Sequence, residues 1–282
     1  MNILITGAKG FLGKELTRYF NQKYTVIAAD RETLDPTKYE DVKQFFMNNK
    51  IDVVIHTANK GGKRNSEQGI MDFYENITMF NNLAHFSGFY NLMFNFGSGA
   101  EFDRRSPIDR AEEKNIENCN PIDYYGLSKN LITRKINNLN KNIVNLRLFG
   151  CFGELEEPQR LLRANYDKIK NHQNPIIFKD KYMDYFFVED VATTIEYIIN
   201  NLNDLKHKDI NLCYRDKYPL SDLVYKMKKT LNSNCSIIIQ DEENFDKPYT
   251  GVATRLEQLN LDLIGLTEGI KRCVKLWELN NS

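Results

Sequence analysis

Short apolar runs recur along the first half of the chain and predict buried strands. They occupy residues 2–6, 24–29, 52–57, 91–96 and 143–148. Each run is almost continuously apolar instead of alternating, as expected of parallel strands that are covered on both faces. Helical patterns fill the intervals, near residues 11–21, 40–49, 70–88 and 124–140. This alternation predicts an α/β fold, a Rossmann-type doubly wound parallel sheet with right-handed crossovers.

The regular alternation of strands and helices changes after about residue 150. Helices are expected at 158–171, 190–202, 219–231 and 267–279, and strands at 175–178, 184–188, 209–213 and 235–239. We interpret residues 1–155 as a dinucleotide-binding domain and 156–282 as a smaller C-terminal α/β region that binds substrate. The two are expected to interleave, with the strand at 184–188 and the helix at 190–202 returning to the first domain.

Composition narrows the class of protein. Lys and Arg total 38, as do Asp and Glu, so the formal net charge is zero and no basic excess points to nucleic acid or an anionic membrane. No apolar run approaches the roughly 20 residues of a membrane span, and the start MNILITG predicts a strand instead of a signal peptide. The five cysteines and four histidines are scattered. We therefore expect no disulfide framework, no metal site and a cytoplasmic location.

A glycine-rich segment follows the first strand at once and opens the first helix. It reads Thr6-Gly-Ala-Lys-Gly-Phe-Leu-Gly13. Gly7 permits a tight turn, Gly10 leaves room for a pyrophosphate, and Gly13 lets helix and strand pack closely. The helix N-terminus offers N–H groups and partial positive charge to phosphates. The segment predicts a dinucleotide site that includes Lys9, Phe11 and Leu12.

The end of the second strand bears on which dinucleotide binds. Asp30 lies 17 residues past Gly13, counted as 30 − 13, near the position at which an acid meets the adenosine ribose. An acid there favours NAD, whereas the guanidinium of the adjacent Arg31 can pair with the 2′-phosphate of NADP. The two residues point in opposite directions, and the residues themselves leave the choice open.

Tyr125 and Lys129 stand four residues apart at the start of a helical pattern. That spacing places them on one helix face. An ammonium beside a phenol favours the phenolate, so we expect Lys129 to lower the pKa of Tyr125 and make it usable in proton transfer. The same lysine can donate a hydrogen bond to a nicotinamide ribose.

Together, the TGxxGxxG loop and the Tyr-x-x-x-Lys pair resemble the extended short-chain dehydrogenase/reductase family, in its nucleotide-sugar-modifying branch. The resemblance covers essentially the whole chain. It includes residues 95–100, where Ser98 matches the catalytic hydroxyl, and Arg147 to Gly153, which is similar to the segment between cofactor and substrate. Residues 184–192 are similar to a stretch of the substrate half, although Met183 replaces the usual arginine before it.

The resemblance implies roles for particular residues. Ser98, Tyr125 and Lys129 are implied as the catalytic group. Further cofactor contacts are implied at Asp35, Thr57, Ala58, Asn76 and Leu148. Substrate contacts are implied at Gly99, Phe149 and Gly150 beside Ser98 and Tyr125. Cations for the substrate diphosphate are expected from the C-terminal half, with Arg160, Lys179 and Arg255 as candidates by region.

Among the reactions of that branch, reduction is favoured. Dehydratases carry an Asp-Glu pair where this chain has Gly99 and Ala100, and GDP-fucose synthases carry an acid/base cysteine where it has Ala100. Residues 58–62 are similar to a loop of the GDP-fucose synthases, and residues 30–35 to a segment of the dTDP-4-keto-rhamnose reductases. Both relatives are reductases.

We therefore expect an NAD(P)H-dependent oxidoreductase that reduces C4 of a nucleotide-linked 4-keto-6-deoxy-sugar in bacterial surface polysaccharide biosynthesis. NADP(H) is favoured as cofactor and NAD(H) is the alternative. A GDP-linked hexose or heptose is favoured as substrate over a dTDP- or CDP-linked one. A homodimer through helices 70–88 and 124–140 is expected. The alternative functions are an NAD-dependent nucleotide-sugar 4-epimerase and a non-catalytic NAD(P)-binding regulator.

Overall fold

A six-stranded parallel sheet forms the centre of the protein in the computed structural model, which describes residues 1–62, 69–241 and 245–280. The strand order is β10-β6-β4-β3-β1-β2, and every neighbouring pair is parallel. The strands are β1 (Asn2–Thr6), β2 (Thr25–Ala29), β3 (Val53–His56), β4 (Leu92–Ser98), β6 (Ile143–Leu148) and β10 (Asp209–Leu212). The predicted Rossmann-type α/β fold is confirmed.

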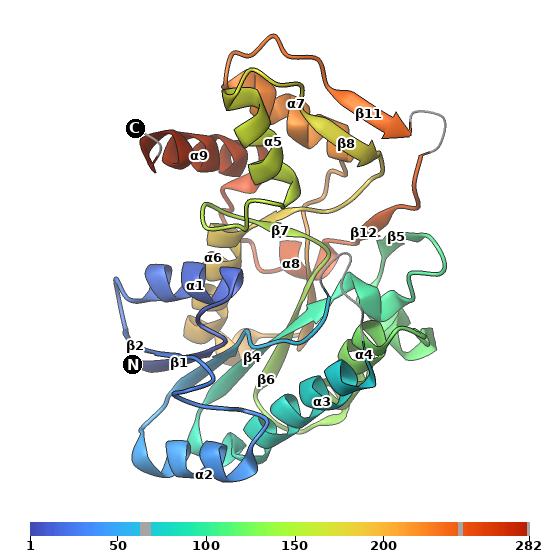
Figure 1. The fold of residues 1–282 in the computed structure, drawn as a ribbon. Coiled ribbons are helices and arrows are strands. Elements are labelled where there is room, and N and C mark those ends of the chain that lie inside the picture. Colours follow the sequence, from blue (N-terminus) through green and yellow to red (C-terminus); the bar gives the residue numbers. More distant parts are fainter. Residues whose placement is uncertain (63–68, 242–244, 281–282) are drawn as a thin grey trace.

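Helices cover both faces of this sheet (Figure 1). One face carries α1 (Phe11–Phe20) and α6 (Val188–Asn200), and the other carries α2 (Tyr39–Asn48), α3 (Ile70–His85) and α4 (Tyr124–Asn138). Alternate residues of a strand point to opposite faces. Ile3 and Ile5 accordingly join the core beneath α1 and α6, whereas Leu4 joins the core beneath the other three helices. Burial on both faces explains why β1 and β3 are mostly apolar.

The C-terminal part forms a smaller layer beyond α1 and α6 (Figure 1). It contains α5 (Leu161–Lys170), α7 (Leu220–Thr230) and α9 (Gly265–Asn280), with the parallel pair β8 (Ile176–Lys179) and β11 (Ile238–Asp241). The indole of Trp277 is buried in α9 and donates a hydrogen bond of 2.7 Å to the carbonyl of Glu154. That contact fixes the last helix to the chain segment that leaves the main sheet.

Short elements connect the two parts. The parallel pairs are β5 (Ile108–Ala111) with β12 (Tyr249–Gly251) and β7 (Cys151–Phe152) with β9 (Phe186–Phe187). The remaining helix is α8 (Thr254–Glu257), and the 3-10 turns are η1 (Ser87–Phe89), η2 (Gly99–Phe102), η3 (Glu113–Asn118) and η4 (Leu202–Asp204). Neither β5 nor β12 has a periodic apolar pattern, and the sequence did not indicate them.

The second half of the chain contributes directly to the main sheet. The strand expected at 209–213 is β10, an edge strand paired with β6, and α6 packs on α1. The strand expected at 184–188 shrinks to the two residues of β9 because Val188 already begins α6. The strand expected at 235–239 lies three residues later, as β11. Within the described ranges, no helix has the length and apolarity needed to cross a membrane.

Candidate active site

The carboxyl ends of the central strands converge on one edge of the sheet. Thr6 of β1 pairs in register with His56 of β3, and Ser98 of β4 with Leu148 of β6. In a parallel sheet the residues that follow these ends meet at a common edge, and ligands bind there. Two cavities open at this edge, with volumes of about 520 Å³ and about 470 Å³. We name them the cofactor cavity and the substrate cavity.

The glycine loop forms one wall of the cofactor cavity. Gly7 has φ +69°, and a Cβ there would lie 2.6 Å from the Cα of Ala58. A Cβ on Gly13 would lie 2.4 Å from the carbonyl oxygen of Gly7, so α1 can pack on β1 only with glycine at this position. Gly13 therefore supports the loop from behind, while Gly7 and Gly10 line the cavity with Lys9 and Phe11.

The start of α1 fits a phosphate. Gly10 is its N-cap, and no side chain caps the first N–H groups. Those groups carry the partial positive charge of the helix and need an acceptor. A Cβ at Gly10 would have as its nearest neighbour the Gly7 carbonyl oxygen at 3.3 Å. Absence of that side chain leaves the helix end open to the cavity, as a dinucleotide pyrophosphate requires.

Lys9 and Asp30 form an ion pair in the wall of the cofactor cavity. The ammonium of Lys9 lies 2.5 Å from the carboxylate of Asp30, whose other oxygen accepts bonds from Thr33 and from the Glu32 N–H. Lys9 and the Thr33 bonds hold the pKa of Asp30 well below its usual range. Asp30 is therefore an anion whose charge Lys9 already compensates.

Four further residues predicted to contact the cofactor line the cofactor cavity: Arg31, Asp35, Thr57 and Ala58. The guanidinium of Arg31 lies 3.2 Å from the carboxylate of Glu75 and is 59% exposed, so it is free to reorient toward a ligand. The carboxylate of Asp35 accepts hydrogen bonds from the Thr37 N–H and hydroxyl.

Ser98, Tyr125 and Lys129 lie together in the wall of the substrate cavity. The Lys129 ammonium stands 5.9 Å from the centroid of the Tyr125 ring and donates a 2.9 Å bond to the carbonyl of Phe96. Asp123 caps α4 by accepting a bond from the Gly126 N–H, which sets where this helix begins. The helix thus presents both side chains to the end of β4.

The expected lowering of the Tyr125 pKa by Lys129 is wrong. Burial raises the pKa of Tyr125, while the hydrogen bond from Ser98 opposes that rise. Burial also lowers the pKa of Lys129 to about 8, and the charge of Glu101 opposes the decrease. Desolvation outweighs the attraction that the spacing alone suggested. Lys129 is still mainly cationic at pH 7.

The loop after β3 closes over Tyr125. Gly62 has φ +76°, and a Cβ there would lie 2.8 Å from Cζ of Tyr125. Asn76 holds this loop, because its amide both accepts from the N–H and donates to the carbonyl of Lys60. Asn76 is buried and lines neither cavity. Its contacts indicate loop support, in place of the cofactor contact predicted for it.

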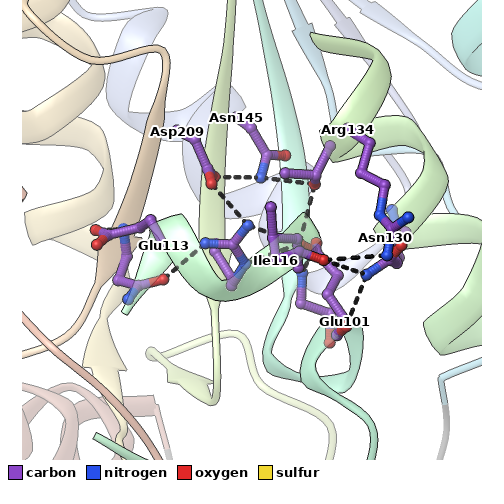
Figure 2. A network of polar contacts seen from close by, with 12 residues as sticks. Glu101, Glu113, Ile116, Asn130, Arg134, Asn145 and Asp209 are labelled. Carbon is purple, nitrogen blue, oxygen red and sulfur yellow. Dashed lines mark hydrogen bonds and ion pairs between the residues drawn. The ribbon is translucent and has the colours of Figure 1, made fainter. Parts of the chain in front are cut away.

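A buried polar network lies behind Ser98. Glu101 accepts a 2.7 Å bond from the Ser98 N–H, and its second oxygen accepts bonds from Thr133 and from Arg147. Arg147 is fully buried and also pairs with Asp209 of β10 at 2.9 Å. Figure 2 shows Glu101, Asn145 and Asp209 within this network. A strand from the second half of the chain thereby fixes the end of β4.

The predicted substrate residues divide into two groups. Phe149, Gly150 and Arg160 line the substrate cavity, as does Leu148, which the sequence assigned to the cofactor. Leu12 lines the same cavity. Gly99 lies behind Ser98, where a Cβ would be 2.4 Å from the Phe149 ring.

Lys179 and Arg255 lie elsewhere. Lys179 pairs with Asp241 across β8 and β11 at 3.2 Å, and Arg255 donates a 2.8 Å bond to the Asp209 carbonyl. Neither lines the cofactor or the substrate cavity. Position in the C-terminal half was too coarse a criterion, because this half also builds the small sheet and the edge strand β10.

Several residues of the substrate cavity were not predicted from the sequence, among them Arg104, Lys181 and Tyr249. Arg104 pairs with Asp123 at 2.7 Å, and the Lys181 ammonium lies 5.8 Å from the centroid of the Tyr249 ring. No local motif marks them, since each reaches the cavity from an irregular segment or from the three-residue strand β12. Among the described residues, no group of His, Cys, Asp and Glu could hold a metal ion.

Comparison with known proteins identifies the family. Residues 3–213 match the NAD dependent epimerase/dehydratase family, so the chain belongs to it. The expected membership in the extended short-chain dehydrogenase/reductases is confirmed, and with it the expectation of an NAD(P)-dependent oxidoreductase. A search of curated protein sequences finds no match.

Solved structures agree on the fold. A GDP-mannoheptose C4 reductase from Campylobacter jejuni with NADP bound matches with TM-score 0.83 and 18% identity, over 98% of each chain. A GDP-D-glycero-L-gluco-heptose synthase from Campylobacter jejuni with NADPH matches with TM-score 0.84 and 18% identity, over 99% of this chain and 98% of that one. A dTDP-4-dehydrorhamnose reductase from Clostridium acetobutylicum matches with TM-score 0.81 and 21% identity, over 99% of this chain and 100% of that one.

Proposed function

We propose that the protein is an NADPH-dependent reductase of a nucleotide-linked 4-keto-sugar. The observation that carries the proposal is the position of Tyr125, which is one of the residues that line both cavities and therefore lies where they meet. A proton donor at that junction can reach a carbonyl in one cavity beside a dinucleotide in the other. The structural relatives include a GDP-mannoheptose C4 reductase and a dTDP-4-dehydrorhamnose reductase, which supports this reaction class.

Each residue of the site has a stated task in this proposal. The nicotinamide, when bound, supplies a hydride to the carbonyl carbon. Tyr125 donates a proton to the oxygen as negative charge develops there, and the Ser98 hydroxyl donates a hydrogen bond to the same oxygen. Lys129 keeps positive charge beside Tyr125 and can donate to a ribose hydroxyl. Its pKa of about 8 leaves it cationic at neutral pH.

The surroundings of Asp30 favour NADPH over NADH. An acid at this position repels a 2′-phosphate, yet Lys9 lies 2.5 Å from Asp30 and offsets its charge. Lys9 and Arg31 both line the cavity, and both are mobile enough to turn toward a phosphate. Two of the structural relatives hold NADP or NADPH. We therefore keep NADP(H) as the favoured cofactor.

Three cations of the substrate cavity are candidates for the substrate diphosphate. Arg104, Arg160 and Lys181 line it, and all three supply N–H donors that suit phosphate oxygens. They replace Lys179 and Arg255 in that role. A GDP-linked hexose or heptose stays the favoured substrate, because two of the relatives carry GDP-heptose names. Its product would then serve bacterial surface polysaccharide synthesis.

A homodimer is proposed through α3 and α4, which lie side by side on one face (Figure 1). Apolar side chains are exposed on both: Ile70, Met71 and Tyr74 on α3, and Tyr124 and Leu131 on α4. Exposed apolar area of this kind is typical of an interface. All five cysteines are unpaired, which supports the proposed cytoplasmic location.

The test is direct. Purified protein is mixed with NADPH and GDP-4-keto-6-deoxy-mannose, with dTDP- and CDP-linked 4-keto-sugars in parallel, and absorbance at 340 nm is followed. The proposal predicts loss of one equivalent of NADPH per sugar reduced. An epimerase would instead copurify with NAD and interconvert 4-epimers without added reductant. Absence of turnover with every sugar would favour a regulator.

A further inference from the structure

The hydroxyl of Ser98 is held by its own turn. Ser98 is the N-cap of η2, and its Oγ accepts a 3.2 Å bond from the Ala100 N–H. Its backbone N–H donates to Glu101 at 2.7 Å, which completes a capping box. A serine hydroxyl has two acceptor positions and one proton. The turn therefore occupies one acceptor position and leaves one open.

Tyr249 faces that open position from the other half of the chain. Its hydroxyl lies 3.5 Å from Ser98 Oγ. Its ring covers Gly99, where a Cβ would lie 2.8 Å from Cζ of Tyr249, and it meets the Phe149 ring edge-to-face at 5.5 Å. Gly99 is the residue that allows this approach. The position after the serine is thus shaped by Tyr249.

The backbone of Tyr249 is anchored at both of its polar groups. Its N–H donates a 2.8 Å bond to the Tyr182 carbonyl, and its carbonyl accepts a 3.2 Å bond from the Asp184 N–H. The Gly251 N–H donates to the Asp184 carboxylate at 2.8 Å, and Lys217 pairs with the same carboxylate at 2.9 Å. The tyrosine ring is therefore placed by the segment 182–184.

We infer that Tyr249 is a positioning residue for Ser98: its hydroxyl donates to Ser98 Oγ and so directs the single serine proton toward Tyr125 and the reacting carbonyl. The inference rests on the proposed reductase function. When the Ala100 N–H and the Tyr249 hydroxyl occupy both acceptor positions of Ser98 Oγ, the serine proton can point only toward the cavity. Preorganised donors cost no reorientation when charge develops on the carbonyl oxygen.

One electrostatic observation agrees with this arrangement. Burial raises the pKa of Tyr249, so its hydroxyl keeps its proton and can act as the donor throughout the neutral range. Ser98 is a hydrogen-bond partner of both phenols and lowers the pKa of each. The direction from Tyr249 through Ser98 to Tyr125 therefore rests on the bond that the Ala100 N–H donates to Ser98 Oγ and on the position of Tyr249.

The experiment is a double-mutant cycle in the reductase assay. Tyr249→Phe keeps the ring on Gly99 and removes only the hydroxyl. We expect kcat to fall about tenfold with the Kd for NADPH unchanged, and Ser98→Ala to cost about a hundredfold. Because Tyr249 acts through Ser98, the double variant should lie within about twofold of Ser98→Ala. Tyr225→Phe is the control, because Tyr225 is an exposed tyrosine of α7 that lines neither cavity, and this variant should retain full activity.

Two outcomes overturn the inference. One is a kcat of Tyr249→Phe within about twofold of wild type. The other is a further tenfold loss when Tyr249→Phe is added to Ser98→Ala, which would mean that Tyr249 contacts the substrate itself. Melting temperatures of all variants establish that they are folded.

A second readout does not need activity. Tyrosines labelled with ¹³C at Cζ are titrated by NMR, with Tyr125→Phe used to assign the Tyr125 signal. Tyr249→Phe should raise the pKa of Tyr125, and it should add nothing in the Ser98→Ala background. An unchanged Tyr125 pKa would refute the inference. If the wild-type protein reduces no sugar, the proposed function fails while this titration still tests the positioning role.

Discussion

The two cavities are built in different ways. The cofactor cavity is formed by short segments at the ends of neighbouring strands, and its features are backbone features: the left-handed Gly7, the uncapped start of α1 and the close pair Gly7–Gly13. The substrate cavity is lined by side chains from widely separated segments, and a fully buried ion network lies behind it. Local backbone geometry can be read from a sequence motif, whereas convergence of distant side chains cannot.

The variant with the largest expected effect distinguishes the catalytic step from cofactor binding. Tyr125→Phe should lower kcat by about 10²–10⁴-fold, the range for a lost general acid. The Kd for NADPH should change less than about twofold, because the glycine loop is untouched. Steady-state kinetics and fluorescence titration measure the two quantities. Comparable losses in both would show that the cavities do not act separately.

The next effect is on stability. Arg147→Met leaves Glu101 and Asp209 buried without their cation, and breaking such a group typically costs about 3–5 kcal/mol. Urea unfolding measures the free energy. Arg272→Met is the control: Arg272 is 45% exposed in its pair with Glu189, and such a pair is worth at most about 1 kcal/mol. Equal destabilisation by the two changes would contradict the role given to the buried network.

A smaller effect concerns the dinucleotide. Lys9→Gln removes the partner of Asp30 and exposes its charge to a 2′-phosphate. We expect about tenfold weaker binding of NADPH, as for the loss of one charge-assisted hydrogen bond, with binding of NADH within about twofold. Lys14→Gln is the control, because Lys14 lies in the first helix after the glycine loop but outside both cavities. Equal weakening of both dinucleotides by Lys9→Gln would exclude discrimination at this position.

The smallest effect is a shift in pH dependence. Lys129 loses its proton as pH rises through about 8, so kcat/KM should fall above that pH. Glu101 raises the pKa of Lys129, and Glu101→Gln should therefore move the fall to lower pH. Glu113 is a second buried acid, which accepts a 2.9 Å bond from the Asn211 N–H and is not among the charges acting on Lys129. Glu113→Gln should therefore leave the profile in place. A fall that stays near pH 8 in Glu101→Gln would contradict this.

The sequence predicted those features of the fold and the site that depend on a local residue pattern. The strands of the sheet, the glycine loop and the Tyr125–Lys129 pair follow from apolar runs and fixed spacings, and the structure has them at those positions. It could not predict Tyr249, since β12 is three residues long and owes its place to bonds with Tyr182 and Asp184. The direction predicted for the pKa of Tyr125 was wrong, because burial of this side chain, in part beneath Gly62, is a tertiary effect.

The most direct test follows a labelled hydride. The protein is incubated with NADPH deuterated at C4 of the nicotinamide and with a nucleotide-linked 4-keto-sugar, and the product is analysed by NMR and mass spectrometry. The account predicts one deuterium at C4 of the sugar for each NADP⁺ formed, and loss of this transfer in Tyr125→Phe. Interconversion of 4-epimers by protein-bound NAD, with no deuterium entering the sugar and no NADPH consumed, would contradict it.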